Sequence, residues 1–262
     1  MILLVTSLVG GAGRSTVSRG VAAALARAGN TVAWVGADIG AGVESEGVDA
    51  SLRATSNGEA LPTEATPVHR VGVADEDDLG WWRGLTRADR DERRATILSR
   101  VSERRDLVVV DAPRIFDAGP LLRRVDRVLV LLPLDRPCPR SLEPMVTELQ
   151  VARHSNARLW LDGIAVTRVD PRRAGTPREL EVTFGLAPPR AFFGPLVPEG
   201  AGPAREGAIE ELAGAWARRA GVVLRARGGA DRGLVGNGDE PAGLPRRESR
   251  QASASVAQVS AP

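Results

Sequence analysis

The chain has 262 residues, with 35 basic and 33 acidic side chains, a formal net charge of +2 and 43% hydrophobic residues. All of the lysine-plus-arginine total is arginine, tyrosine is absent, and Cys138 is the only cysteine. This length allows one large domain or two small ones. The near balance of charge does not identify a nucleic-acid-binding protein, and one cysteine excludes a disulfide or a cysteine-based metal site within the chain.

The N-terminus leads directly into an apolar run, without a basic segment or a cleavage site. No apolar run approaches the roughly 18 residues that a membrane-spanning helix needs. We therefore expect a cytoplasmic protein without a transmembrane segment.

The first elements predict one strand–helix–strand unit. The runs "ILLVTSL" at 2–8 and "TVAWVGA" at 31–37 are apolar on both faces, which is typical of buried parallel strands. Between them, apolar residues recur at helical spacing over 15–29, and Gly29 marks the end of that helix.

The same alternation continues along the chain. Residues 40–66 are rich in glycine and polar side chains, which predicts a loop with at most one short helix. Further strands are expected at 69–74, 107–113, 127–135, 157–170 (ending near Thr167) and 190–198, and further helices at 86–104, 139–154, 176–185 and 204–226. Repeated strand–helix alternation predicts an α/β domain with a mostly parallel central sheet and right-handed crossovers.

The composition changes near residue 228. From there the chain is dominated by Gly, Ser, Arg, Gln and Pro, which cannot bury enough apolar surface to fold alone. We expect a folded domain over 1–227 and a disordered tail over 228–262.

The segment "VGGAGRST" at 9–16 follows the first predicted strand and opens the first predicted helix. Glycines at 10, 11 and 13 would let backbone N–H groups approach phosphate oxygens, and the helix N-terminus would favour their charge. A cation then meets the outer phosphates and a hydroxyl meets Mg²⁺, positions that Arg14 and Ser15 occupy. An ordinary glycine turn from strand to helix is the open alternative.

Several segments together resemble the ParA/MinD family of P-loop ATPases. The matches occur in the family's order and cover roughly residues 1 to 225. The "GGAGRST" loop resembles the family's deviant Walker motif, KGGxGK(S/T)T, and the other matching segments are "VGADIGAG", "LVVVDAP" (its Walker B strand), "GIAVTRVDPR" and "GPLVPEG". The resemblance implies a three-layer P-loop NTPase-like fold that binds ATP with Mg²⁺, and a nucleotide-dependent homodimer.

The sequence departs from that family at four important positions. Val9 stands where the family has the signature lysine that reaches across the dimer, and Arg14 replaces the Walker lysine. Gly36 replaces an aspartate, and Thr167 replaces the asparagine that contacts adenine. Arginine still binds phosphate through a bidentate fork, but it is longer than lysine. The sequence therefore predicts nucleotide binding with weak or slow hydrolysis.

The resemblance assigns roles residue by residue. Arg14 and Asp38 are the expected catalytic residues, the latter orienting or deprotonating the attacking water. Ser15 and Asp111 are the expected Mg²⁺ ligands. The expected nucleotide-binding residues are Gly10, Gly11, Ala12, Gly13, Arg14, Ser15, Thr16, Thr167 and Arg168. Each of the two aspartates has an alternative role as a helix cap.

Other features carry weaker signals. The acidic run 75–78 is expected to be a solvated loop, the neighbouring Trp81 and Trp82 to pack in the core, and the apolar face of the last helix to pack on its own sheet rather than on a membrane. The arginine clusters at 90–94, 104–105, 123–127 and 172–173 are expected to be solvated helix faces rather than DNA contacts.

Three functions stay open from the sequence. The favoured one is an ATP-dependent dimerisation and positioning switch, with a protein partner unknown and DNA or membrane-surface contact weakly indicated. The second is a non-catalytic scaffold that has lost nucleotide binding. A biosynthetic relative such as dethiobiotin synthetase is the third, although no substrate-pocket motif supports it.

Overall fold

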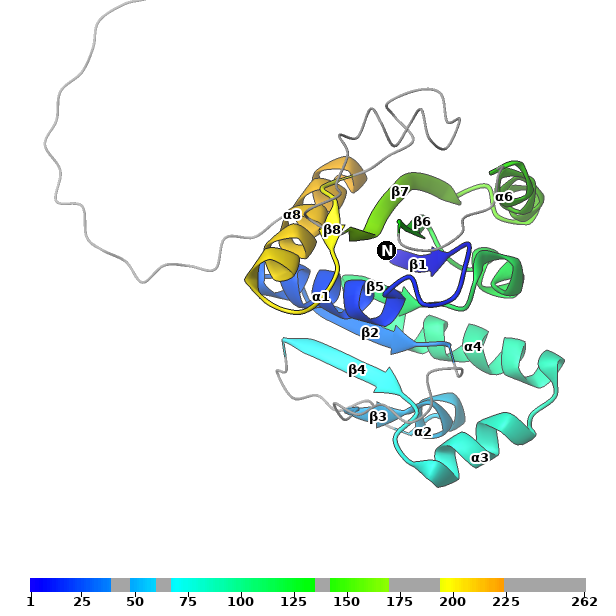
Figure 1. The fold of residues 1–262 in the computed structure, drawn as a ribbon. Coiled ribbons are helices and arrows are strands. Elements are labelled where there is room, and N and C mark those ends of the chain that lie inside the picture. Colours follow the sequence, from blue (N-terminus) through cyan, green and yellow to red (C-terminus); the bar gives the residue numbers. More distant parts are fainter. Residues whose placement is uncertain (39–47, 60–66, 135–141, 170–193, 224–262) are drawn as a thin grey trace, which may run out of the picture. The chain divides into compact units, whose positions relative to one another are not determined.

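A single parallel sheet forms the centre of the protein (Figure 1). The structure is a computed structural model that describes residues 1–38, 48–59, 67–134, 142–169 and 194–223. The described residues all belong to one unit, Met1–Arg227. The sheet has eight strands in the order β3-β4-β2-β5-β1-β6-β7-β8, and every neighbouring pair is parallel. The predicted α/β fold class is confirmed.

The strands match most of the predicted runs, although several are shorter. They are β1 (Ile2–Ser7), β2 (Val32–Gly36), β3 (Ala50–Ser51), β4 (Val68–Gly72), β5 (Leu107–Asp111), β6 (Arg127–Pro133), β7 (Trp160–Val169) and β8 (Val197–Pro198). The described helices are α1 (Arg14–Arg27), α2 (Leu52–Asn57), α3 (Glu76–Gly84), α4 (Arg87–Ser102), a 3₁₀ turn η2 (Ile115–Asp117), α5 (Gly119–Leu122), α6 (Glu143–Ser155) and α8 (Pro203–Ala220). The predicted helix at 176–185, the start of the strand at 190–198 and the tail lie outside the described residues.

Alternation along the strands divides the core into two halves, one on each face of the sheet. On β1, Leu3 and Val5 belong to the core half that contains α1 and α8, whereas Ile2 and Leu4 belong to the half that contains α2 to α6. Figure 1 shows α1 and α8 together on one face, with α4 and α6 on the other. A three-layer arrangement follows, because successive strand side chains point to opposite faces.

A buried polar contact ties α8 to the sheet. A register shift in β7 sets Asp162 between the paired residues Leu161 and Gly163. Its carboxylate accepts hydrogen bonds from Trp216 Nε1 on α8, at 2.8 Å, and from Arg127 Nη1, at 3.0 Å. The apolar face of α8 is buried, so the prediction that this face packs on the protein's own body is confirmed.

Two expectations about charged segments are wrong. The acidic run 75–78 is exposed at its first three residues, but it begins α3 instead of forming a loop, because the Asp75 side chain accepts a hydrogen bond from Asp78 N and so caps this helix. Asp78 is itself buried and accepts from the backbone N–H groups of Arg53 and Ala74. Burial raises the pKa of the Asp78 carboxyl, while these hydrogen bonds act to lower it. Local sequence could not reveal this burial, since one donor, the N–H of Arg53, comes from α2.

The arginine cluster at 90–94 is also not a uniformly solvated face. Arg94 lies largely buried beside the Trp82 ring, which is itself fully buried as predicted. Its guanidinium pairs with Asp91 at 3.2 Å and donates to the carbonyl of Ala37 at 3.0 Å. Arg94 therefore supports the end of β2. The cluster at 172–173 lies outside the described residues.

Candidate functional site

The glycine loop connects the carboxyl end of β1 to the first turn of α1. Gly11 and Gly13 adopt left-handed conformations, with φ of 73° and 77°, which side-chain-bearing residues rarely adopt. A Cβ atom added to Gly10 or Gly13 would meet no atom within 4 Å. The loop therefore faces open space on the side of these two glycines. The first turn of α1 holds Ser15 and Thr16, as the sequence predicts.

Arg14 turns back from α1 toward the ends of two strands. Its Nη2 atom lies 2.6 Å from Asp38 Oδ2, just beyond β2, and its Nη1 atom donates to the carbonyl of Ala112, just beyond β5. The Arg14 and Asp38 side chains are 15% and 21% exposed. The two predicted catalytic residues are thus brought together, but as partners in an ion pair with each other.

Asp111, the last residue of β5, lies next to this pair. Its side chain is almost completely buried, and burial raises the pKa of the Asp111 carboxyl to about 6. The hydrogen bond from Ser15 and the charge of Arg14 act to lower this pKa, whereas the charge of Asp38 raises it. The Oδ1 atom of Asp111 is buried without a hydrogen-bond partner in the described part of the chain. A carboxylate oxygen that is buried and unsatisfied is open to a further donor or a cation.

A small hollow of about 110 Å³ lies beside the glycine loop, at the ends of β7 and β8. Val17, Val197 and Pro198 give it an apolar lining. Polar side chains also line it, from α1 (Thr16), from β7 (Thr167 and Arg168) and from β8 onward (Glu199 and Arg205). The hollow therefore adjoins both the loop backbone and the end of β7.

The predicted nucleotide residues on β7 take different roles at this hollow. The hydroxyl of Thr167 donates to the carbonyl of Ala12 at 2.8 Å. Arg168 has φ of 55°, the only left-handed side-chain-bearing residue in the described segments, and pairs with Glu199 at 2.6 Å. The structure thus brings Thr167 and Arg168 to the glycine loop.

Sequence reasoning missed several residues at this site. Glu199 and Arg205 line the hollow, and the Nε atom of Arg205 is buried without a hydrogen-bond partner. Both follow β8, which has two residues, whereas the sequence predicted a longer strand over 190–198. Val9, which the sequence aligns with the family's signature lysine, lies partly buried against the core.

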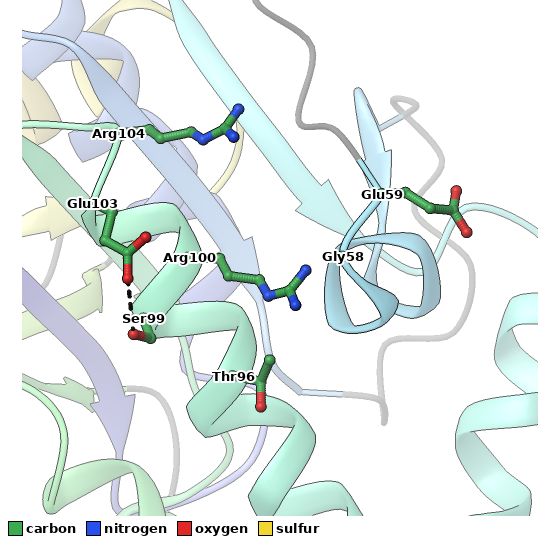
Figure 2. Close-up of a pocket in the computed structure, with 7 residues that line it drawn as sticks. All are labelled: Gly58, Glu59, Thr96, Ser99, Arg100, Glu103 and Arg104. Carbon is green, nitrogen blue, oxygen red and sulfur yellow. Dashed lines mark hydrogen bonds between the residues drawn. The ribbon is translucent and has the colours of Figure 1, made fainter.

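A second cavity, of about 500 Å³, lies between α2 and the end of α4 (Figure 2). Arg100 points across it toward Gly58, and its Nη1 atom donates to the carbonyl of Thr55 at 3.3 Å. The lining includes two arginines and two glutamates, so it has no excess of either charge. Because α4 ends just before β5 begins, this cavity belongs to the amino edge of the sheet, opposite Asp111. We do not include it in the site.

Comparison with known proteins gives matches of structure alone. No known protein family matches the sequence, and no curated protein matches it. A cobyrinic acid a,c-diamide synthase from Mycobacterium smegmatis, solved with ADP and magnesium, has a TM-score of 0.65 and 20% identity over 84% of this chain and 95% of that one. The septum site-determining protein MinD from Pyrococcus horikoshii, solved with Mg-ADP, has a TM-score of 0.57 and 16% identity over 84% and 97%. A plasmid partition protein from Borrelia burgdorferi has a TM-score of 0.57 and 14% identity over 83% and 98%.

The chain has the fold of the ParA/MinD P-loop ATPases. The resemblance that the motifs indicated is therefore confirmed at the level of the fold. At these identities the likeness concerns the arrangement of the backbone, and what this chain binds must be argued from its own residues. Within the described segments, no helix is long and apolar enough to cross a membrane.

Proposed function

We propose that this ParA/MinD-like chain binds a nucleoside triphosphate with Mg²⁺ at the carboxyl edge of its sheet and hydrolyses it slowly. The observation that carries this proposal is the pairing of an open glycine loop with a buried, unsatisfied carboxylate. Gly10 and Gly13 leave the loop backbone accessible, and Asp111 Oδ1 lacks a partner close to the Ser15 hydroxyl. Ligands of open α/β sheets bind at this edge.

The residues present fit a hydrated Mg²⁺ ion with a phosphate chain. Mg²⁺ prefers oxygen ligands and usually keeps several waters, so few protein groups are needed. Ser15 and Asp111 would hold it, and the ion would neutralise charge on the phosphates. The backbone N–H groups of the loop and the N-terminus of α1 would bind the phosphate oxygens. The two neighbours solved with nucleotide and magnesium support the same cofactors.

The Arg14–Asp38 pair supports the slow-turnover part of the proposal. Phosphoryl transfer depends on positioning and on neutralising charge in the transition state. Arg14 must leave Asp38 before it reaches a phosphate, and Asp38 must lose this partner before it orients a water. Val9 offers no charge at the position of the family's cross-dimer lysine. Binding depends on the backbone loop, so it is less affected than hydrolysis.

A nucleotide-dependent homodimer is part of the same proposal. Its support is the site's open side, where a second copy would cover the phosphates. Sedimentation of the full chain with a non-hydrolysable ATP analogue and Mg²⁺ should show a heavier species than the nucleotide-free chain. An unchanged sedimentation coefficient at saturating analogue would contradict the dimer without contradicting binding.

The scaffold function stays as the second candidate, because Arg14 pairs with Asp38 and Ser15 forms a hydrogen bond with Asp111, so these side chains have partners within the chain. Calorimetry and thermal unfolding with ATP, ADP and GTP, each with and without Mg²⁺, separate the two. At 100 times its dissociation constant, a ligand stabilises a protein by about 2.7 kcal/mol. No stabilisation at millimolar nucleotide would favour the scaffold.

Two glycine variants make that experiment specific. In Gly13→Asp, the new carboxylate would lie where the phosphates bind, so nucleotide stabilisation should disappear. Gly221→Asp is the matched control, because Gly221 is also left-handed, with φ of 70°, and is also open around its Cβ position, but it ends α8. Both variants carry the same backbone strain, and only the first should lose binding.

A further inference from the structure

The hydroxyl of Thr167 joins the end of β7 to the glycine loop across 155 positions of sequence. It donates to the carbonyl of Ala12 over 2.8 Å, and Thr167 is only 2% exposed. A hydrogen bond in so dry a position is well ordered, since no water competes for either partner. The contact was not expected from the sequence, which placed Thr167 against the nucleotide itself.

This contact fixes the direction of a phosphate-binding donor. In a trans peptide, the C=O of one residue and the N–H of the next point in opposite directions. Because the Ala12 carbonyl is held toward β7, the N–H of Gly13 is directed away from β7. Gly11 and Gly13 would otherwise let this peptide rotate, since glycine loses more backbone freedom than any other residue on becoming ordered.

The same contact prevents Thr167 from donating a hydrogen bond to a base. A hydroxyl has one proton, and here that proton is donated to Ala12. Thr167 therefore cannot donate to a ring nitrogen while it holds the loop. Strong discrimination between related ligands requires buried polar groups that one ligand satisfies and the other does not.

Several other groups at the hollow are also occupied or lack a donor. Pro198 has no N–H, and the N–H of Glu199 already donates to the carbonyl of Val169 at 3.0 Å. The side chains of Arg168 and Glu199 pair with each other, and they are 30% and 48% exposed. Val17 and Val197 supply apolar contact that any flat ring can use.

We propose that Thr167 is a positioning residue for the phosphate loop and does not donate a hydrogen bond to the base of a bound nucleotide. This inference rests on the proposed nucleotide site for its second half only. Loop positioning is a property of the nucleotide-free chain. Loss of the Thr167 hydroxyl should therefore weaken ATP and GTP by the same factor, because neither base receives its proton.

Two substitutions test the role of the hydroxyl. Thr167→Val keeps the shape of the side chain and removes the hydroxyl. Thr167→Ser keeps the hydroxyl and removes the methyl group. Affinity should be measured for ATP, GTP and inorganic tripolyphosphate, which has no base. Thr167→Val should weaken all three by the same factor, about three- to tenfold, the worth of one hydrogen bond. Thr167→Ser should restore most of the affinity.

Amide hydrogen exchange in the nucleotide-free chain supplies a readout that needs no ligand. The amide of Val17, which donates to the carbonyl of Gly13 at 2.9 Å, should exchange faster in Thr167→Val than in the wild type or Thr167→Ser, while amides in the middle of α4 stay unchanged. Unchanged exchange at Val17 would overturn the positioning role, whether or not nucleotide binds. Absence of all ligand binding by the wild type would instead contradict the proposed function and the base inference, leaving the exchange result to decide the positioning role.

One binding result would also overturn the inference. Thr167→Val could weaken ATP while leaving tripolyphosphate unchanged, which would show that Thr167 contacts the base.

Discussion

The guanidinium of Arg14 lies 2.6 Å from the carboxylate of Asp38, and both side chains are mostly shielded from water. Arg14 also donates to the carbonyl of Ala112, so one side chain joins the ends of β2 and β5 to α1. A shielded ion pair of this kind is costly to break from one side, because the remaining charge loses its partner without regaining full hydration.

Removing this arginine should therefore destabilise the nucleotide-free chain. Arg14→Ala should lower the free energy of unfolding by about 2 kcal/mol, because Asp38 and the Ala112 carbonyl lose a donor. Arg27→Ala is the matched control, since Arg27 and Glu210 form an equally close pair at 2.5 Å with side chains 54% and 57% exposed. It should cost less than about 1 kcal/mol. Equal losses in urea unfolding would contradict this account.

Turnover should depend on the two positions where this chain lacks lysine. We expect slow phosphate release from the wild type at saturating ATP. Arg14→Lys and Val9→Lys should act together, so the double variant should exceed the product of the single effects, because both cations act on one phosphate. Adding Asp38→Ala should remove the gain. Fast wild-type turnover, or a triple variant as fast as the double, would refute this prediction.

The raised pKa of Asp111 predicts a pH-dependent stability. Burial raises the pKa of the folded carboxyl from 3.8 to about 6. Between these values the folded chain holds a proton that the unfolded chain has released, so stability falls as the pH rises from about 4 to 6. This rise in the pKa of Asp111 corresponds to a loss of folding stability on the order of 3 kcal/mol across that pH range.

Asp111→Asn isolates this contribution, because other buried carboxyls titrate equally in both proteins. Subtracting its unfolding free energies from those of the wild type at each pH should give a difference that falls through this window and is flat above about pH 7. A difference that is flat from pH 4 to 7 would show that Asp111 is ionised in the folded chain throughout.

The contact between Trp216 and Asp162 should hold α8 on the sheet. Trp216→Phe removes the hydrogen bond to a fully buried carboxylate and should cost about 2 kcal/mol, because bonds to charged groups are strong. Trp160→Phe, at a side chain 48% exposed, should cost less than about 0.5 kcal/mol. Urea unfolding measures both. A loss for Trp216→Phe no larger than the control's would show that packing alone holds this helix.

The tail from 228 should be dispensable for folding. A chain that ends at 227 should melt within about 2 °C of the full chain, because the tail lacks apolar periodicity. Thermal unfolding followed by far-ultraviolet circular dichroism measures this. A melting temperature many degrees lower would show that the tail packs on the domain.

The sequence by itself determined the fold class and most of the elements. Strands such as β5, Leu107–Asp111, are buried on both faces, so a continuous apolar run marks them wherever they lie. Helices such as α1 repeat apolar residues every three or four positions because one stripe faces the sheet. These signals are local. β3, with two residues, was missed because a strand so short has no period to detect.

Only the tertiary structure decided which partners the site residues take. Arg14 is 24 positions from Asp38 and 98 from Ala112, and Thr167 is 155 from Ala12. The parallel order β2-β5-β1-β6-β7 brings the carboxyl ends of these strands to one edge of the sheet. The polar side chains at or just beyond the strand ends meet there. The sequence named the residues, because their chemistry is local. It could not assign their partners. A hydrogen bond requires the distance between its two atoms to be right to within a few tenths of an ångström, and packing of the whole sheet sets that distance.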